Sequence, residues 1–125
     1  MSTLKVNTLQ DASGGNSSTS EQINEGRAKN WINFNGNTPA IRDSFNVSSL
    51  TDNATGDFTV NFSTSFSNAN YCVNSAGNYQ DSAATGRLWA PVRQQLAGSV
   101  RVKFIGAAAQ DLDSERSFVC CHGDM

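Results

Sequence analysis

The sequence predicts an all-β protein in which an antiparallel, jelly-roll-like β-sandwich follows an extended N-terminal arm. Short segments of alternating apolar and polar residues recur along the chain, and polar residues typical of turns separate them. The 14 Asn, 16 Ser and 9 Thr favour this class further, because their side chains compete for the backbone hydrogen bonds of a helix. A chain of 125 residues can bury a core of its own. We assign residues 1–29 to the arm and residues 30–125 to the sandwich.

The arm begins with a segment that has the pattern of a strand. Residues 4–9 alternate apolar and polar side chains, as a half-buried strand does. An isolated strand is not stable in water, so Leu4, Val6 and Leu9 are expected to pair with another part of the chain or of an assembly. We therefore interpret residues 1–29 as an arm for attachment or oligomerisation.

The rest of the arm is polar. Residues 11–20 contain two adjacent glycines and read as a flexible linker. Ser18 and Glu21 have the spacing of a capping box, which would start one or two helical turns within residues 21–29. An irregular coil is an equally good interpretation of that segment, because it offers a single apolar anchor.

Seven short strands are predicted from residue 30 onward, and the polar turns between them suit a sandwich or a barrel. The predicted strands span residues 31–34, 39–50, 57–62, 70–73, 87–92, 99–104 and 118–121. The clearest local pattern is a hairpin around a loop at residues 52–56, since Phe58, Val60 and Phe62 alternate with polar residues. Pro91 indicates that its segment is an edge strand or a strand end, because proline cannot donate a hydrogen bond between strands.

Charge, hydropathy and cysteine content argue against several functional classes. The net charge is −2 and the basic residues are scattered, whereas a nucleic-acid-binding protein normally carries a basic stripe. No apolar run approaches the roughly 18 residues of a membrane span, and the first ten residues lack the apolar core of a secretory signal. Three cysteines, an odd number, fit poorly with a disulfide-framed secreted domain. We expect a protein made in a reducing cytoplasm, with no cofactor, no nucleic-acid partner and no membrane span.

The single histidine follows two cysteines, and this cluster is the strongest candidate for metal chemistry. On a strand, Cys120 and His122 would share a face while Cys121 would point to the other, so the three cannot readily bind one ion. Cys72 could approach from another strand as a further ligand or as a disulfide partner. Because the CxxC spacing of metal sites is absent, buried structural cysteines are favoured over a metal site, and no catalytic residue is assigned.

A polar loop flanked by two aromatic residues is the candidate binding surface. Aromatic rings in loops can stack on sugars, and loops carry function more often than the strands that they connect. The residues of this surface are Tyr79, Gln80, Asp81, Arg87 and Trp89. A core position for Trp89 is an equally good interpretation.

Four blocks of the chain occur in an order that is typical of one group of proteins. The blocks, at residues 4–15, 28–36, 41–62 and 68–71, read LKVNTLQDASGG, AKNWINFNG, IRDSFNVSSLTDNATGDFTVNF and NANY. They resemble a module of tail-fibre and appendage proteins from bacteriophages that infect marine cyanobacteria. The resemblance covers residues 4–73, whereas residues 79–123 have no counterpart in the pattern.

The resemblance implies a non-enzymatic virion component that is made in the cytoplasm of the host bacterium and is commonly a homotrimer. Its N-terminal arm would join other virion proteins, and its β domain would point outward and could bind a glycan or a protein of the host surface. A capsid decoration or head-fibre protein is the alternative, and a small glycan-processing enzyme is a third interpretation. No catalytic residue is carried over from the family.

Overall fold

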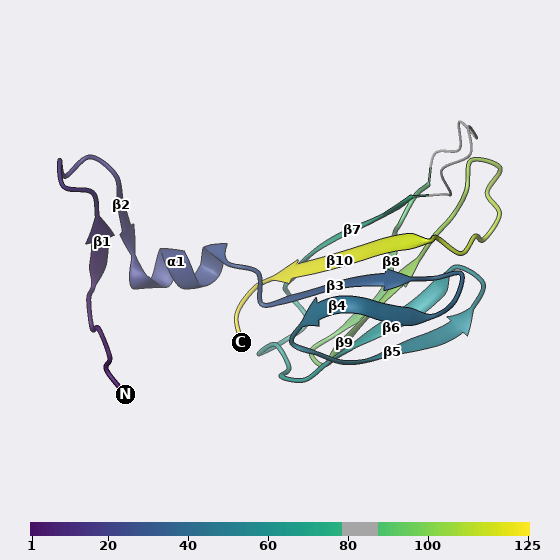
Figure 1. Ribbon diagram of the computed structural model, residues 1–125, viewed down its shortest axis with the longest axis horizontal. Helices are drawn as coiled ribbons and strands as arrows, with labels where there is room; N and C mark the ends of the chain where they lie inside the picture. Colours follow the sequence, from purple (N-terminus) through teal and green to yellow (C-terminus); the bar gives the residue numbers. More distant parts are fainter. Residues whose placement is uncertain (79–87) are drawn as a thin grey trace.

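Two four-stranded antiparallel sheets pack face to face in the computed structural model, which describes residues 1–78 and 88–125 (Figure 1). The first sheet contains, in spatial order, β4 (Ala40–Phe45), β3 (Asn30–Asn35), β10 (Arg116–His122) and β7 (Cys72–Asn78). The second sheet contains β5 (Val47–Ala54), β6 (Asp57–Phe62), β9 (Ser99–Lys103) and β8 (Val92–Leu96). The predicted all-β antiparallel sandwich is confirmed, whereas its likeness to a jelly roll and the assignment of the N-terminal segment as an extended arm stay predictions.

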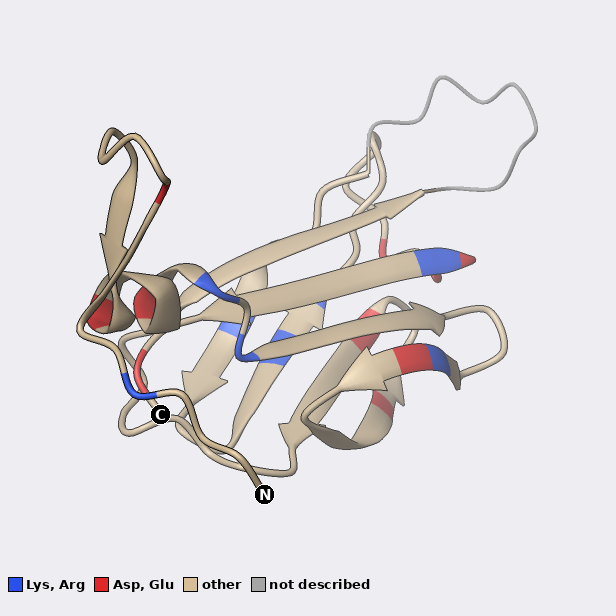
Figure 2. Cartoon of the chain, turned by 60° about the vertical axis from the view of Figure 1, so that its left-hand side comes forward, with Lys and Arg blue, Asp and Glu red and all other residues tan. Residues whose placement is uncertain are grey.

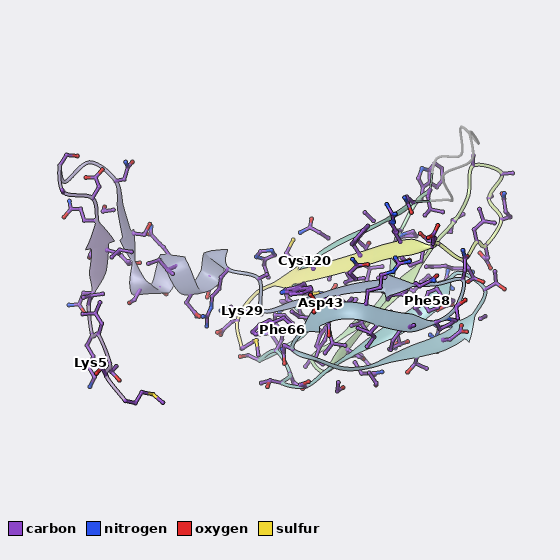
Figure 3. All side chains as sticks on the ribbon, in the orientation of Figure 1. Lys5, Lys29, Asp43, Phe58, Phe66 and Cys120 are labelled. Atoms are coloured by element: carbon purple, nitrogen blue, oxygen red, sulfur yellow. The ribbon has the colours of Figure 1, made fainter. Side chains whose placement is uncertain are left out.

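Aromatic side chains from both sheets fill the space between them. The Phe34 ring of the first sheet lies 5.1 Å from the Phe58 ring of the second, and Phe104 packs edge-on against both at 6.1 and 6.2 Å. Each such pair contributes about 0.5–1.5 kcal/mol beyond the burial of its area. Figure 3 shows Phe58 and Phe66 near opposite ends of the sandwich. At the second end, Phe66 stacks on Tyr71 with ring centroids 4.1 Å apart.

The chain passes from the first sheet to the second at one residue, Asn46. The predicted extended segment at residues 39–50 is wrong in this respect, because the structure divides it into β4 and β5, which belong to different sheets. Asn46 has a φ of 55°, a left-handed conformation that turns the chain between the two strands. Its side-chain amide donates to the carbonyl oxygens of Lys29 (3.1 Å) and Thr64 (3.0 Å), and its Oδ1 accepts from the Thr64 amide (2.7 Å).

The predicted hairpin is confirmed as β5–β6, although β5 continues to Ala54 and leaves a shorter turn than residues 52–56. Gly56 closes this turn with a φ of 68°. The Gly56 amide donates to the Asp113 carboxylate (2.7 Å), and its carbonyl oxygen accepts from the Phe104 amide (2.7 Å). An added Cβ would lie 2.7 Å from the Phe104 carbonyl oxygen, so both the conformation and the space require glycine.

Two other strands differ from the predicted bounds. The strand predicted at residues 70–73 instead runs from Cys72 to Asn78 as β7 and pairs with β10 over its whole length. Gly77 leaves no room for a Cβ, which would approach the Phe104 ring to 2.9 Å. The strand predicted at residues 87–92 instead begins after Pro91 and forms the edge strand β8. The interpretation of Pro91 as a mark of an edge or a strand end is therefore confirmed, and residue 87 lies outside the described residues.

The N-terminal segment forms a small hairpin and a short helix that project from one end of the sandwich (Figure 1). Strand β1 (Thr8–Gln10) pairs with β2 (Ser17–Thr19), and helix α1 (Ser20–Gly26) follows directly. The strand predicted at residues 4–9 is therefore placed too early, and part of the predicted linker is itself a strand. Among the residues that the structure describes, no helix has the length and apolar character of a membrane crossing.

Local hydrogen bonds explain these differences in the arm. The helix is capped by Thr19 rather than by Ser18: the Gln22 amide donates to Thr19 Oγ1 (3.1 Å), and the Thr19 amide donates to Gln22 Oε1 (2.9 Å). The Asp11 carboxylate closes the turn between the two strands by accepting from Ser13, Gly15 and Asn16. The hydrogen bond from the Ser13 side chain is the main cause that lowers the pKa of Asp11 to about 2.

Candidate functional site

The outer side of the first sheet carries large apolar side chains that solvent reaches. Antiparallel register places Phe45, Trp31 and Cys120 side by side across β4, β3 and β10. In the next row, Phe118 of β10 lies opposite Ala76 of β7. Trp31, Phe45 and Phe118 are 37%, 54% and 41% exposed. We name these five residues the outer apolar face.

The outer side of the second sheet differs, because polar side chains there bind one another. The Asn61 amide donates to Ser49 Oγ (3.1 Å) and to Thr51 Oγ1 (3.0 Å) across the β5–β6 pair. Arg101 of β9 makes a bidentate ion pair with Asp57 of β6, with nitrogen–oxygen distances of 2.6 and 2.8 Å. This hydrogen-bonded ion pair holds the pKa of Asp57 below its ordinary value. Apart from the exposed Val92 and Leu96 of the edge strand β8, this sheet presents a polar outer side to water, whereas the outer apolar face exposes aromatic rings.

The cysteine–histidine cluster lies beside the outer apolar face. As predicted, Cys120 and His122 share the outer side of β10, with Sγ and Nε2 3.4 Å apart, while Cys121 is buried in the core. Cys72 pairs directly with His122 across the β7–β10 ladder. Strand β10 is an inner strand of the first sheet, and His122 is its last residue.

The chemistry of Cys120 and Cys121 is that of neutral thiols. Burial is the main cause that raises the pKa of Cys120, and it raises the pKa of Cys121 to about 12. All three cysteines are free thiols, so the disulfide with Cys72 that the sequence left open is not formed. Within residues 1–78 and 88–125, no group of three ligating side chains has the geometry of a metal site.

The predicted binding loop is largely beyond what the structure describes. Tyr79, Gln80, Asp81 and Arg87 lie outside the described residues. Trp89 is 61% exposed and forms an isolated bridge with the backbone of residue 105, so its core interpretation is wrong. The exposed ring keeps Trp89 as a candidate contact.

The arm presents the apolar side chains that the sequence singled out. Leu4, Val6 and Leu9 are all exposed, and Leu4 and Val6 precede the first strand. Leu9 of β1 and Ile23 of α1 line one hollow of about 670 Å³, which we name the arm hollow. Figure 3 shows Lys5 far from the sandwich and Lys29 at the junction, where the Lys29 amide donates to the Cys121 carbonyl oxygen (2.9 Å).

Charged residues are interspersed over both parts of the molecule. Figure 2 shows Lys and Arg positions next to Asp and Glu positions on the sheets, and acidic positions on the arm helix. Specific pairs include Lys103 with Asp111 at 2.9 Å and Arg42 with Glu115 at 3.8 Å. The expectation that nucleic acid is not a partner stays a prediction.

The outer apolar face was missed by the sequence analysis, although the sequence contains a signal for it. Strands that are covered on both sides read as continuous apolar runs rather than as alternating ones. Trp31 is followed by the apolar Ile32, and residues 118–121 are apolar without interruption. These runs identify β3 and β10 as strands with apolar side chains on both faces.

Comparison of the chain with known proteins adds no family to these findings. No protein-family description, no curated protein and no solved structure matches it.

Proposed function

We propose that this chain is a non-enzymatic structural protein of a bacteriophage virion, assembled into a tail fibre or a similar appendage. The observation that carries the proposal is the arm, in which residues 1–28 include no buried side chain. A two-stranded hairpin and a two-turn helix are at best marginally stable alone in water. An arm of this kind gains stability by docking on a neighbouring subunit, which is what assembly into a particle provides. The resemblance of residues 4–73 to appendage proteins of cyanobacterial phages agrees with this role.

In this proposal the sandwich faces outward and contacts the host surface. The partners would be a glycan or a protein of the host, and the exposed Trp89 next to the loop is the best-placed described contact. Many weak contacts of this type, multiplied by the copy number of the appendage, give adhesion without a deep pocket. The protein would then be found in the virion after synthesis in the host cytoplasm.

The proposal is tested by looking for the chain in purified virus particles. We expect the full-length chain in the particles by mass spectrometry, and we expect a variant that lacks residues 1–20 to be absent from them. Circular dichroism of the purified variant checks that its sandwich is still folded. A folded variant that still enters particles would contradict the role of the arm, and absence of the full-length chain would contradict the virion assignment.

A capsid decoration or head-fibre protein is the second candidate, because an arm that docks on a neighbour suits a capsid shell equally well. Immunogold labelling of intact particles separates the two, since label on tails supports an appendage and label on heads supports decoration. Release of reducing ends from host polysaccharide by the purified chain would instead support a glycan-processing enzyme.

A further inference from the structure

We infer that the outer apolar face is covered by the arm of a second copy of this chain. The inference deepens the proposed function, and it rests on that function in treating the arm as an assembly element. It goes further by naming the surface on which the arm docks and by making the partner another copy of the same chain.

The first argument is the apolar character of the face. Trp31, Phe45 and Phe118 lie on adjacent strands, and each exposes more than a third of its surface. On the outer side of the second sheet, polar side chains bind one another, as in the Arg101–Asp57 ion pair. In these two rows the apolar side chains run diagonally across the sheet, with Asn33 and Asp43 on one side of them and Asn74 on the other. Exposed apolar side chains flanked by polar ones mark an interaction surface.

The second argument is that the arm offers a matching surface that its own domain leaves uncovered. Leu9 and Ile23 are exposed at the arm hollow, whose other lining residues are polar or glycine. Figure 1 shows the hairpin and helix extending away from the sandwich rather than folding over the first sheet. Docking of the arm on the outer apolar face would bring its exposed Leu9 and Ile23 against exposed aromatic side chains such as Phe45. Two exposed apolar surfaces of the same chain are thereby buried together.

The third argument is the area that a stable interface requires. Four strands spaced about 4.8 Å apart and six residues long give a sheet face of about 400 Å². A stable interface buries about 800 Å² on each partner, so two such faces pressed together provide about half of what is needed. If each copy donates one arm and receives one, it contributes both its face and a comparable area of its arm. In an exchanged dimer the two arm–face contacts together reach the required area of about 800 Å² on each partner, whereas in a closed trimer each pair of copies shares one contact of about 400 Å².

The cysteines of the first sheet provide an internal reporter. Cys120 is part of the outer apolar face and would be covered by a docked arm, whereas Cys121 is buried in the core whether or not an arm is present. Alkylation of Cys120 therefore reports the docked arm, and alkylation of Cys121 reports unfolding of the sandwich.

The test compares four full-length chains by light scattering on a sizing column. These are the unaltered chain, an arm variant (Leu9→Thr with Ile23→Gln), a face variant (Trp31→Thr with Phe118→Thr) and a control (Leu96→Thr), whose side chain is exposed on the second sheet. We expect a dimer or trimer of the 13.4 kDa chain for the unaltered protein and the control, and a monomer for the arm and face variants. We also expect Cys120 to be alkylated about tenfold faster in those two variants, a ratio that corresponds to about 1.4 kcal/mol of interface stability. Cys121 should stay unreactive in all four.

Each other outcome would overturn the inference in an identifiable way. An oligomer that survives the arm substitutions would mean that the faces pair without the arm, and one that survives the face substitutions would mean that the arms pair with each other. An unaltered chain that is monomeric would also refute it. Failure of the proposed function looks different, because a chain that is absent from virus particles can still exchange arms in solution.

Discussion

Substitution of Asn46 separates the two contributions by which this residue turns the chain from one sheet into the other. Glycine adopts a φ of 55° without strain but removes the side chain, whereas alanine removes the side chain and is also strained in the left-handed region. The side chain makes three hydrogen bonds to the backbone, two from its amide to Lys29 and Thr64 and one to its Oδ1 from the Thr64 amide, and its amide also donates weakly to Met125 Sδ (3.9 Å). The two variants therefore share the loss of these hydrogen bonds and differ in backbone conformation, through the strain of the folded alanine and the greater unfolded-state entropy of glycine.

The expected magnitudes follow from these contacts. A typical intramolecular hydrogen bond contributes about 1 kcal/mol net, and Asn46 is half-buried, so water replaces part of what is lost. We expect Asn46→Gly to lower the free energy of unfolding by about 2 kcal/mol. Asn46→Ala should lower it by about 1 kcal/mol more, because a residue with a Cβ is strained at positive φ.

Urea unfolding followed by tryptophan fluorescence measures both values. With slopes of about 1–3 kcal/mol per molar urea, the midpoint should fall by about 1 M for Asn46→Gly and further for Asn46→Ala. The exposed Asn70→Ala serves as the control and should stay within about 0.5 kcal/mol of the unaltered chain. Equal stabilities of the glycine and alanine variants would refute the conformational argument, and an unchanged glycine variant would refute the hydrogen-bonding argument.

The ion pair and the turn of the second sheet yield two further predictions. Because Arg101 lowers the pKa of Asp57 in the folded state, the pair stabilises the fold above the ordinary carboxyl pKa of 3.8, and this stability is lost as the pH falls through the lowered value. Thermal melts between pH 2 and 7 should show a smaller fall in melting temperature toward acidic pH for Asp57→Asn than for the unaltered chain. Parallel pH profiles of the two melting temperatures would contradict the stabilising role of the ion pair. Gly56→Ala should lower the free energy of unfolding by more than about 2 kcal/mol, because Gly56 has a positive φ and lies close to the Phe104 carbonyl oxygen. Thermal unfolding measures this change. Gly26→Ala, with open space around the Cβ, is the matched control and should be neutral.

Local patterns account for the parts of the fold that were predicted. The β5–β6 hairpin was found because its alternating apolar residues and its turn are neighbours in the sequence. The strands around Trp31 and Val119 were found for the same reason, although their pairing could not be. Strand β10, at the end of the chain, lies between β3 and β7, and this arrangement depends on which faces pack together over long sequence separations.

The wrong predictions arose where two local conformations were equally compatible with the sequence. Ser18 with Glu21 and Thr19 with Gln22 both have capping-box spacing, and the structure uses the second pair because β2 runs up to Thr19. The segment at residues 39–50 is extended on both sides of Asn46, so its composition gave no sign of a break. The left-handed turn there is held by contacts with Lys29 and Thr64, which are 17 and 18 residues away.

For the candidate site, the composition showed that the arm is polar with a few isolated apolar side chains. The order of the residues showed that the cysteines of β10 alternate between two faces. Tertiary structure decided what surrounds them. Cys72 reaches His122 because β7 pairs with β10, and Trp31 meets Phe45 and Cys120 because β3 lies between β4 and β10. Periodicity along one strand depends on the residue order alone, and the sequence therefore determined which side chains share a face. The lateral order of strands depends on the burial of the whole core, so only the folded chain could bring these apolar side chains together into one face.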